Sequence, residues 1–106
     1  MKINQQVKIL VSEPWDFTSP EENNIFTGVV IDSTNSVFGE TYLIKINKPF
    51  VMNGLSINYI VVIYRNKDKD SRNLNIAYIP DDVVDQFRKL EEIKDKLKFI
   101  IIGSLD

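Results

Sequence analysis

Side chains able to do chemistry in this chain of 106 residues are mainly carboxylates, because the sequence contains no histidine and no cysteine. Histidine is the usual general acid or base near neutral pH, so Ser-His and Cys-His relays are excluded, as are thiolate and imidazole metal sites. The acidic residues include three adjacent pairs, Glu21-Glu22, Asp81-Asp82 and Glu91-Glu92. Adjacent side chains on a helix or strand point in different directions, so adjacency builds no catalytic pair. We expect no enzyme and no cofactor. The catalytic alternative is two carboxylates converging from separate loops, as in a glycosidase.

The segment from Asn66 to Ala77 copies part of a calcium-binding loop. Asn66, Asp68 and Asp70 occupy its first three ligand positions. The sixth position requires glycine and the twelfth a bidentate glutamate, but this chain has Ser71 and Ala77 there. The sequence therefore predicts a charged, solvated turn and no bound metal.

The balance of charge argues against a general nucleic-acid-binding protein. The chain has 13 basic and 15 acidic residues and a formal net charge of −2. Basic residues gather in two segments, Arg65–Arg72 and Lys89–Lys98, but acidic residues are interspersed in both. Phosphate-driven affinity needs uncompensated positive charge, so a nucleic-acid partner is not expected. The alternative is a nucleic-acid-binding barrel that uses Tyr42, Tyr59 or Tyr64 and the lysines near the C-terminus.

A segment near the N-terminus combines aromatic and acidic residues. It contains Trp15, Asp16 and Phe17, followed by Glu21 and Glu22. Such side chains on a loop held by a rigid scaffold are typical of protein-binding surfaces, and tryptophan is a frequent hot spot. We therefore take these five residues as the candidate binding site. The alternative is that Trp15 or Phe17 plugs an open end of the fold.

Alternating apolar residues predict the strands that must hold this loop. The first four strands cover Gln6–Val11, Ile25–Asp32, Tyr42–Ile46 and Ile57–Arg65. The last of these is apolar at consecutive positions, so we expect it to be a central strand covered on both faces. A fifth strand covers Leu74–Ile79 and ends before a proline.

Glycine, proline and short polar residues mark the turns. Gly28 indicates a bend or bulge within the second strand, and Pro49 indicates either interrupted pairing or a strand at an edge. The cluster Ser33–Ser36, together with Gly39, predicts a reversal. Asn53-Gly54 between apolar residues predicts a two-residue hairpin that pairs Met52 with Leu55 and Phe50 with Ile57.

The C-terminal part predicts one helix and a final strand. Apolar residues at helical spacing extend over about 82–97, and they are Val83, Phe87, Leu90 and Leu97. This stripe would cap an open end of the fold or cover the second face of the fourth strand. Lys98–Gly103 then changes to a continuous apolar run, which predicts a last strand over Phe99–Gly103.

Consecutive strands with short connections favour an antiparallel meander that closes as a small barrel. The first strand, the aromatic-bearing loop, the glycine-containing second strand, the Asn53-Gly54 hairpin and the late return strand together resemble the SH3-like barrels over most of the chain. We thus expect a mainly β fold, an SH3-like barrel of five to six strands with one C-terminal helix before the last strand. A long helix departs from the SH3-like layout, and an OB-like barrel is the alternative.

These observations favour a single domain over residues 1–106 that binds a protein and does no catalysis. One version is a bacterial immunity or antitoxin protein whose acidic face covers a cationic toxin. A structural or oligomerising module is a further alternative. The longest apolar run, Tyr59–Tyr64, is too short to span a membrane, and the N-terminal residues contain no signal-peptide core. We therefore expect a cytoplasmic protein with no membrane partner.

Overall fold

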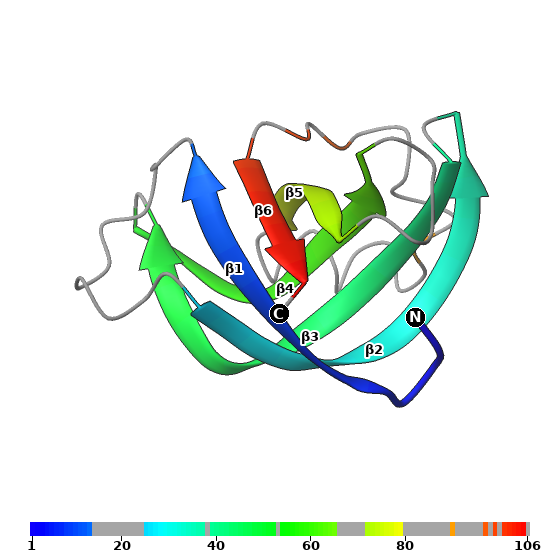
Figure 1. The fold of residues 1–106 in the computed structure, drawn as a ribbon. Helices are drawn as coiled ribbons and strands as arrows, with labels where there is room; N and C mark the ends of the chain where they lie inside the picture. Colours follow the sequence, from blue (N-terminus) through cyan, green and yellow to red (C-terminus); the bar gives the residue numbers. More distant parts are fainter. Residues whose placement is uncertain are drawn as a thin grey trace.

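The computed structural model describes residues 1–13, 25–37, 39–52, 54–65, 72–79, 90, 97, 99 and 101–105. Within these residues the chain forms six strands: β1 (Gln6–Glu13), β2 (Ile25–Ser36), β3 (Gly39–Met52), β4 (Leu55–Tyr64), β5 (Asn73–Ile79) and β6 (Ile101–Leu105). Each strand pairs antiparallel with its neighbours in sequence, and β6 pairs with β1 to close a barrel. Figure 1 shows β6 lying beside β1.

This topology confirms the predicted mainly β, small antiparallel barrel. Its strand order is a simple meander, whereas an OB-fold is a Greek-key barrel, so the OB-like alternative is wrong. The helix expected over about 82–97 lies outside the described residues except for Leu90 and Leu97. Leu90 has a helical conformation and Leu97 lies outside any helix or strand, so the expected helix as a whole stays a prediction.

Apolar side chains that alternate along the strands fill the barrel interior. The buried cluster contains thirteen residues from β1 to β5: Val7, Ile9, Val11, Phe26, Val30, Tyr42, Ile44, Ile46, Ile60, Val62, Tyr64, Leu74 and Ile76. Met1, Tyr78 and Leu105 are partly buried against it. Eight strands already leave an interior that side chains fill, so a six-stranded barrel packed in this way has no open lumen.

The outer face of β3, β4 and β5 is also buried, because more of the chain packs on it. A second cluster lies there: Leu43, Val61, Ile79 and Leu90 are buried, and Tyr59, Leu97 and Phe99 pack partly buried against them. Val61 therefore contacts this outer cluster while Val62, the next residue, faces the interior. This confirms β4 as the central strand that needs cover on both faces.

A hydrogen bond on the outside of the barrel holds Leu90 at this second cluster. The Leu90 backbone N–H donates to Oδ2 of Asp32 at the outside of β2, with an N–O distance of 3.0 Å. The other carboxylate oxygen accepts from the Ser33 backbone N–H at 2.8 Å. Asp32 thus ties Leu90 to β2, beside the face that Leu90 helps to cover.

Close approach of the strands accounts for Gly28. A β-carbon at this position would lie 2.5 Å from the Lys45 carbonyl oxygen and 2.8 Å from Cγ2 of Ile44. The expected irregularity of β2 is a register shift between Val30 and Asp32. The bulge therefore lies at Ile31, and Gly28 provides room for β3 at a regular point of the ladder.

Two predictions about the β3–β4 hairpin are confirmed. Met52 pairs with Leu55 across the Asn53-Gly54 turn, and Gly54 has a φ of 79°, as predicted. Pairing between β3 and β4 is interrupted between Lys45 and Phe50, where Pro49 lies, also as predicted.

The expected turn over Ser33–Ser36 is wrong, because these residues continue β2 and pair with Gly39–Tyr42 of β3. Hydroxyl contacts stabilise the extended pairing: Ser36 Oγ and Thr41 Oγ1 are 2.9 Å apart. The chain reverses after Ser36, and Gly39 supplies a φ of 117°.

Candidate binding face

The outer side of β2 carries exposed residues over much of its length. Phe26 and Val30 face the interior, so Ile25, Thr27 and Val29 face outward. Ile25 and the bulge residue Ile31 are both 40% exposed, although they are large aliphatic residues. The outer side of β2 therefore presents a mainly aliphatic row between Ile25 and Ile31.

Lysines flank this row on both neighbouring strands. Lys8 of β1 pairs with Thr27, and Lys45 of β3 pairs with Val29. Both lysines are exposed. Asn47 of β3 donates a hydrogen bond from Nδ2 to Thr27 Oγ1 at 3.2 Å, which joins β3 to β2 at the surface. We call the set Ile25, Thr27, Val29, Ile31, Lys8, Lys45 and Asn47 the β2 face.

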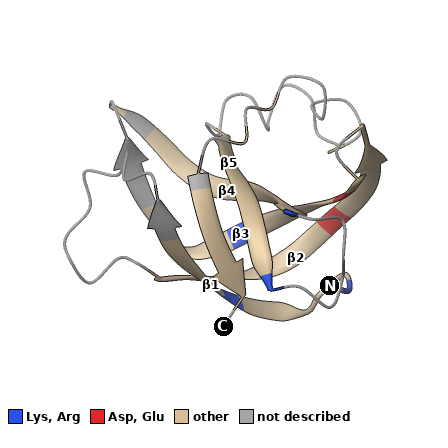
Figure 2. Ribbon diagram, turned by 45° about the horizontal axis from the view of Figure 1, so that its top comes forward, with Lys and Arg blue, Asp and Glu red and all other residues tan. Residues whose placement is uncertain are grey.

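Charge is distributed unevenly along these strands. The described residues include six cations, which are Lys2, Lys8, Lys45, Lys48, Arg65 and Arg72, and three acidic residues, which are Glu13, Asp32 and Glu40. Asp32 and Glu40 lie toward the turn that joins β2 to β3, as Figure 2 shows in red. The β2 face as defined contains two lysines and no acidic residue, in a chain of net charge −2.

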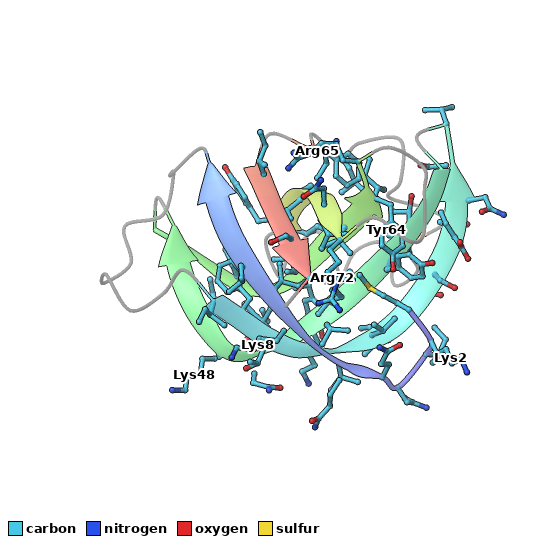
Figure 3. All side chains as sticks on the ribbon, in the orientation of Figure 1. Lys2, Lys8, Lys48, Tyr64, Arg65 and Arg72 are labelled. Carbon is cyan, nitrogen blue, oxygen red and sulfur yellow. The ribbon has the colours of Figure 1, made fainter. Side chains whose placement is uncertain are left out.

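The directions of the basic side chains show which cations belong to the β2 face. In Figure 3, Lys8 of β1 and Lys48 of β3 point away from the barrel at the same end, while Lys2 lies toward the opposite end of β2. Arg65 belongs to a different region, because its Nη2 donates to the Leu74 carbonyl oxygen at 3.4 Å. The cations of the β2 face are therefore Lys8 and Lys45, with Lys48 next to them.

Two of the tyrosines considered for nucleic-acid stacking are inside the barrel. Tyr42 and Tyr64 are buried and meet edge to face, with ring centroids 6.1 Å apart. Burial raises the pKa of Tyr42 well above its ordinary value, and a hydrogen bond with Glu40 and the charge of that carboxylate add to the rise. Neither ring can stack on a base. Tyr59 packs partly buried against the second cluster.

The five residues proposed from the sequence as a binding site, Trp15, Asp16, Phe17, Glu21 and Glu22, lie outside the described residues. Their loop connects the end of β1 at Glu13 to the start of β2 at Ile25, so it joins the two strands that carry Lys8 and Ile25. The structure therefore relates the loop to the β2 face by connectivity. Sequence reasoning missed the β2 face, although the alternation Ile25-x-Thr27-x-Val29 was visible.

The described residues contain no group of three acidic side chains placed to hold a metal ion. Nor do they include a helix with the length and apolar composition that crossing a membrane requires. Comparisons with family models, curated proteins and solved structures find no match for this chain.

Proposed function

We propose that this chain is a non-catalytic binding barrel that recognises a protein partner through the β2 face. The observation that carries the proposal is the contrast between two outer faces. The chain's own C-terminal part buries Leu43, Val61 and Ile79 on one of them. The other leaves Ile25 and Ile31 each 40% exposed. Exposed aliphatic residues that line up along one strand mark interaction surfaces more often than isolated ones do.

The packed interior supports an external rather than an internal binding site. Inward side chains of β1 to β5 form one continuous buried cluster. Small-molecule sites in barrels need a lumen wide enough to hold the ligand beside the side chains. Binding by this barrel is thus assigned to its surface and to the loops that connect the strands.

The biological setting that we propose is a cytoplasmic, bacterial immunity or antitoxin protein of the small SH3-like type. A single packed barrel without histidine or cysteine suits a partner-blocking role, since blocking needs a rigid surface and no chemistry. The loop with Trp15, Asp16, Phe17, Glu21 and Glu22 would extend the β2 face, because it connects β2 to β1, one of the two strands that flank the face. The acidic residues of this loop would meet cationic groups of a toxin.

Affinity capture with matched variants tests the proposal. Ile25→Glu places a charge in the aliphatic row, and Val37→Glu is the control, since Val37 is 79% exposed at the β2–β3 turn. We expect a partner captured by the wild-type protein and Val37→Glu to be lost with Ile25→Glu. Retention of the same partner by Ile25→Glu would contradict the proposal. Trp15→Ala and Glu21→Lys test the loop in the same experiment.

The immunity version has its own test. The chain is co-expressed with each neighbouring gene of its source, and growth is measured with and without it. Relief of growth inhibition by the wild-type chain, but not by Ile25→Glu, is the expected result. Neighbouring genes that do not affect growth would count against this version.

A nucleic-acid-binding barrel is the second candidate, favoured by Lys8 and Lys48 at one end of the barrel and by Lys45, which pairs with Val29. Phosphate contacts predict retention on single-stranded DNA or RNA that weakens steeply with salt. The burial of Tyr42 and Tyr64 removes the base-stacking part of this hypothesis. Lack of retention at low salt would exclude it.

A further inference from the structure

We infer that the β2 face fits a particular partner chemistry: an acidic amphipathic helix, with an apolar stripe bordered on both sides by aspartate or glutamate. This inference rests on the proposed function, since it names the kind of protein segment that the face would bind. It is drawn from three properties of the face, which are its hydrogen-bonded backbone, its dimensions and its arrangement of charge.

In the middle of the β2 face, at Gly28 and Val29, the backbone of β2 is paired with a strand on each side. Gln6–Leu10 of β1 pair with Ile25–Val29 of β2 on one side, and β3 pairs with Gly28–Ser36 on the other. Recognition by strand addition requires a free strand edge. A partner at the β2 face must therefore bind through side chains, which is the way in which helices pack on sheets.

The dimensions of the face match one helix. From Ile25 to Ile31 the strand extends about 20 Å, at roughly 3.3 Å per residue. This length corresponds to about 13 residues, or nearly four turns, of α-helix. The strands on either side of β2 are about 10 Å apart, given a spacing near 4.8 Å, which is close to the diameter of a helix at about 10–12 Å.

The positions of the lysines indicate which residues should border the apolar stripe of that helix. Lys8 on β1 and Lys45 on β3 lie on opposite sides of the aliphatic row, because each pairs directly with a β2 residue. Each strand neighbouring β2 thus contributes a cation beside an apolar centre. Complementary potentials fix partner choice and orientation, so acidic residues on both edges of an apolar stripe would match this face.

A display library of helical peptides, selected on the full-length protein, tests the inference. We expect the recovered peptides to combine an aliphatic stripe with acidic edges. The double variant Lys8→Glu/Lys45→Glu should bind them at least about ten-fold more weakly at low salt, since edge charges act mainly on association rate and specificity. Selection on this variant should instead recover peptides with basic edges. Val37→Glu serves as the control and should bind like the wild-type protein.

Backbone amide shifts of the folded double variant, measured by NMR, show whether the barrel is intact. In the wild-type protein, the amides of Thr27, Val29 and Lys45 should shift on addition of a selected peptide. Recovered peptides with neutral or basic edges, or equal binding by the double variant, would overturn the inference. So would stronger binding of a single-stranded oligonucleotide, or occupation of the face by a second copy of the chain.

This experiment separates the inference from the proposed function. If a captured cellular partner is lost with Ile25→Glu, while the library shows no preference for acidic edges, the inference fails and the proposed function stands. If Ile25→Glu retains the partner, the proposed function fails first. The selected peptides would then describe a surface that binds no cellular partner, so the inference would fail as well.

Discussion

Replacing Gly28 by alanine tests how closely β2 and β3 approach in this barrel. The added methyl carbon would lie 2.5 Å from the Lys45 carbonyl oxygen and 2.8 Å from Cγ2 of Ile44. Elsewhere in a strand, the change from glycine to alanine stabilises by about 0.5–1 kcal/mol, because glycine loses more backbone entropy on folding. The sign of the effect is therefore diagnostic.

The nearest atom belongs to the backbone of a paired strand, so it cannot rotate away as a flexible side chain could. Overpacking of a core typically costs 1–3 kcal/mol, and we expect about 3 kcal/mol for Gly28→Ala. Small domains are stable by roughly 5–15 kcal/mol, so this is a large fraction of the total. For a domain near this size, the midpoint of thermal unfolding would fall by about 4–8 °C for each kcal/mol.

Urea unfolding followed by circular dichroism measures this change. Gly54→Ala is the matched control, since Gly54 has no neighbouring atom within 4 Å but has a φ of +79°. Its expected cost is only the left-handed backbone, about 1–2 kcal/mol. A Gly28→Ala protein that is unfolded without urea agrees with the prediction. A variant as stable as the wild-type protein, or more stable, would refute the close approach of β3.

Three further predictions concern the covered face and the interior. Leu90→Ala should lower the free energy of unfolding by about 2–5 kcal/mol in urea titrations, because Leu90 is fully buried against Leu43 and Val61; a loss below about 1 kcal/mol would contradict that packing. Asp32→Ala should cost about 1–3 kcal/mol and speed hydrogen exchange of the Leu90 amide, which donates to Asp32 at 3.0 Å; unchanged exchange would argue against the bond. The raised pKa of Tyr42 means that the unfolded chain releases this proton near pH 10 while the folded chain retains it. Stability should therefore be unaffected by this group below about pH 10 and fall by about 1.4 kcal/mol per pH unit above it. Tyr42→Phe should remove that part of the slope in urea titrations between pH 9 and pH 11, and an identical slope in both proteins would contradict the assignment.

Turn residues and prolines in the sequence predict the parts of the fold that depend on backbone geometry over a few residues. Asn53-Gly54 places residues that tolerate positive φ between apolar runs, so its hairpin register is predictable. Pro49 has no N–H to donate, so the interruption beside it is predictable as well. The order of strands follows, because short connections require antiparallel neighbours.

Polar composition was misleading where strand pairing overrode it. Ser33–Ser36 resembles a turn, but Ser36 and Thr41 form a hydroxyl contact across the β2–β3 ladder and extend the strand instead. The burial of Tyr42 was readable from its phase with Ile44 and Ile46, which face the same interior. The base-stacking hypothesis was based on the aromatic ring alone and did not use this alternation, which places Tyr42 on the inward face of the strand.

The candidate site was less predictable, because exposure depends on contacts that are distant in sequence. The alternation of β2 shows two faces. It does not show that Leu90, Leu97 and Phe99 pack on the outside of β3 to β5 while Ile25 and Ile31 of β2 stay exposed. The sequence also separates Lys8 from Lys45 by 36 intervening residues, and only the register of β1, β2 and β3 places them on either side of one aliphatic row.

Site-specific photo-crosslinking in living cells tests the central claim most directly. A photoreactive amino acid replaces Thr27, at the centre of the β2 face, or Ser56, which is exposed on β4 away from it. We predict one crosslinked protein species from position 27, absent from position 56 and lost when Ile25→Glu is added. Crosslinks to nucleic acid from position 27, or to protein from position 56 alone, would contradict the account.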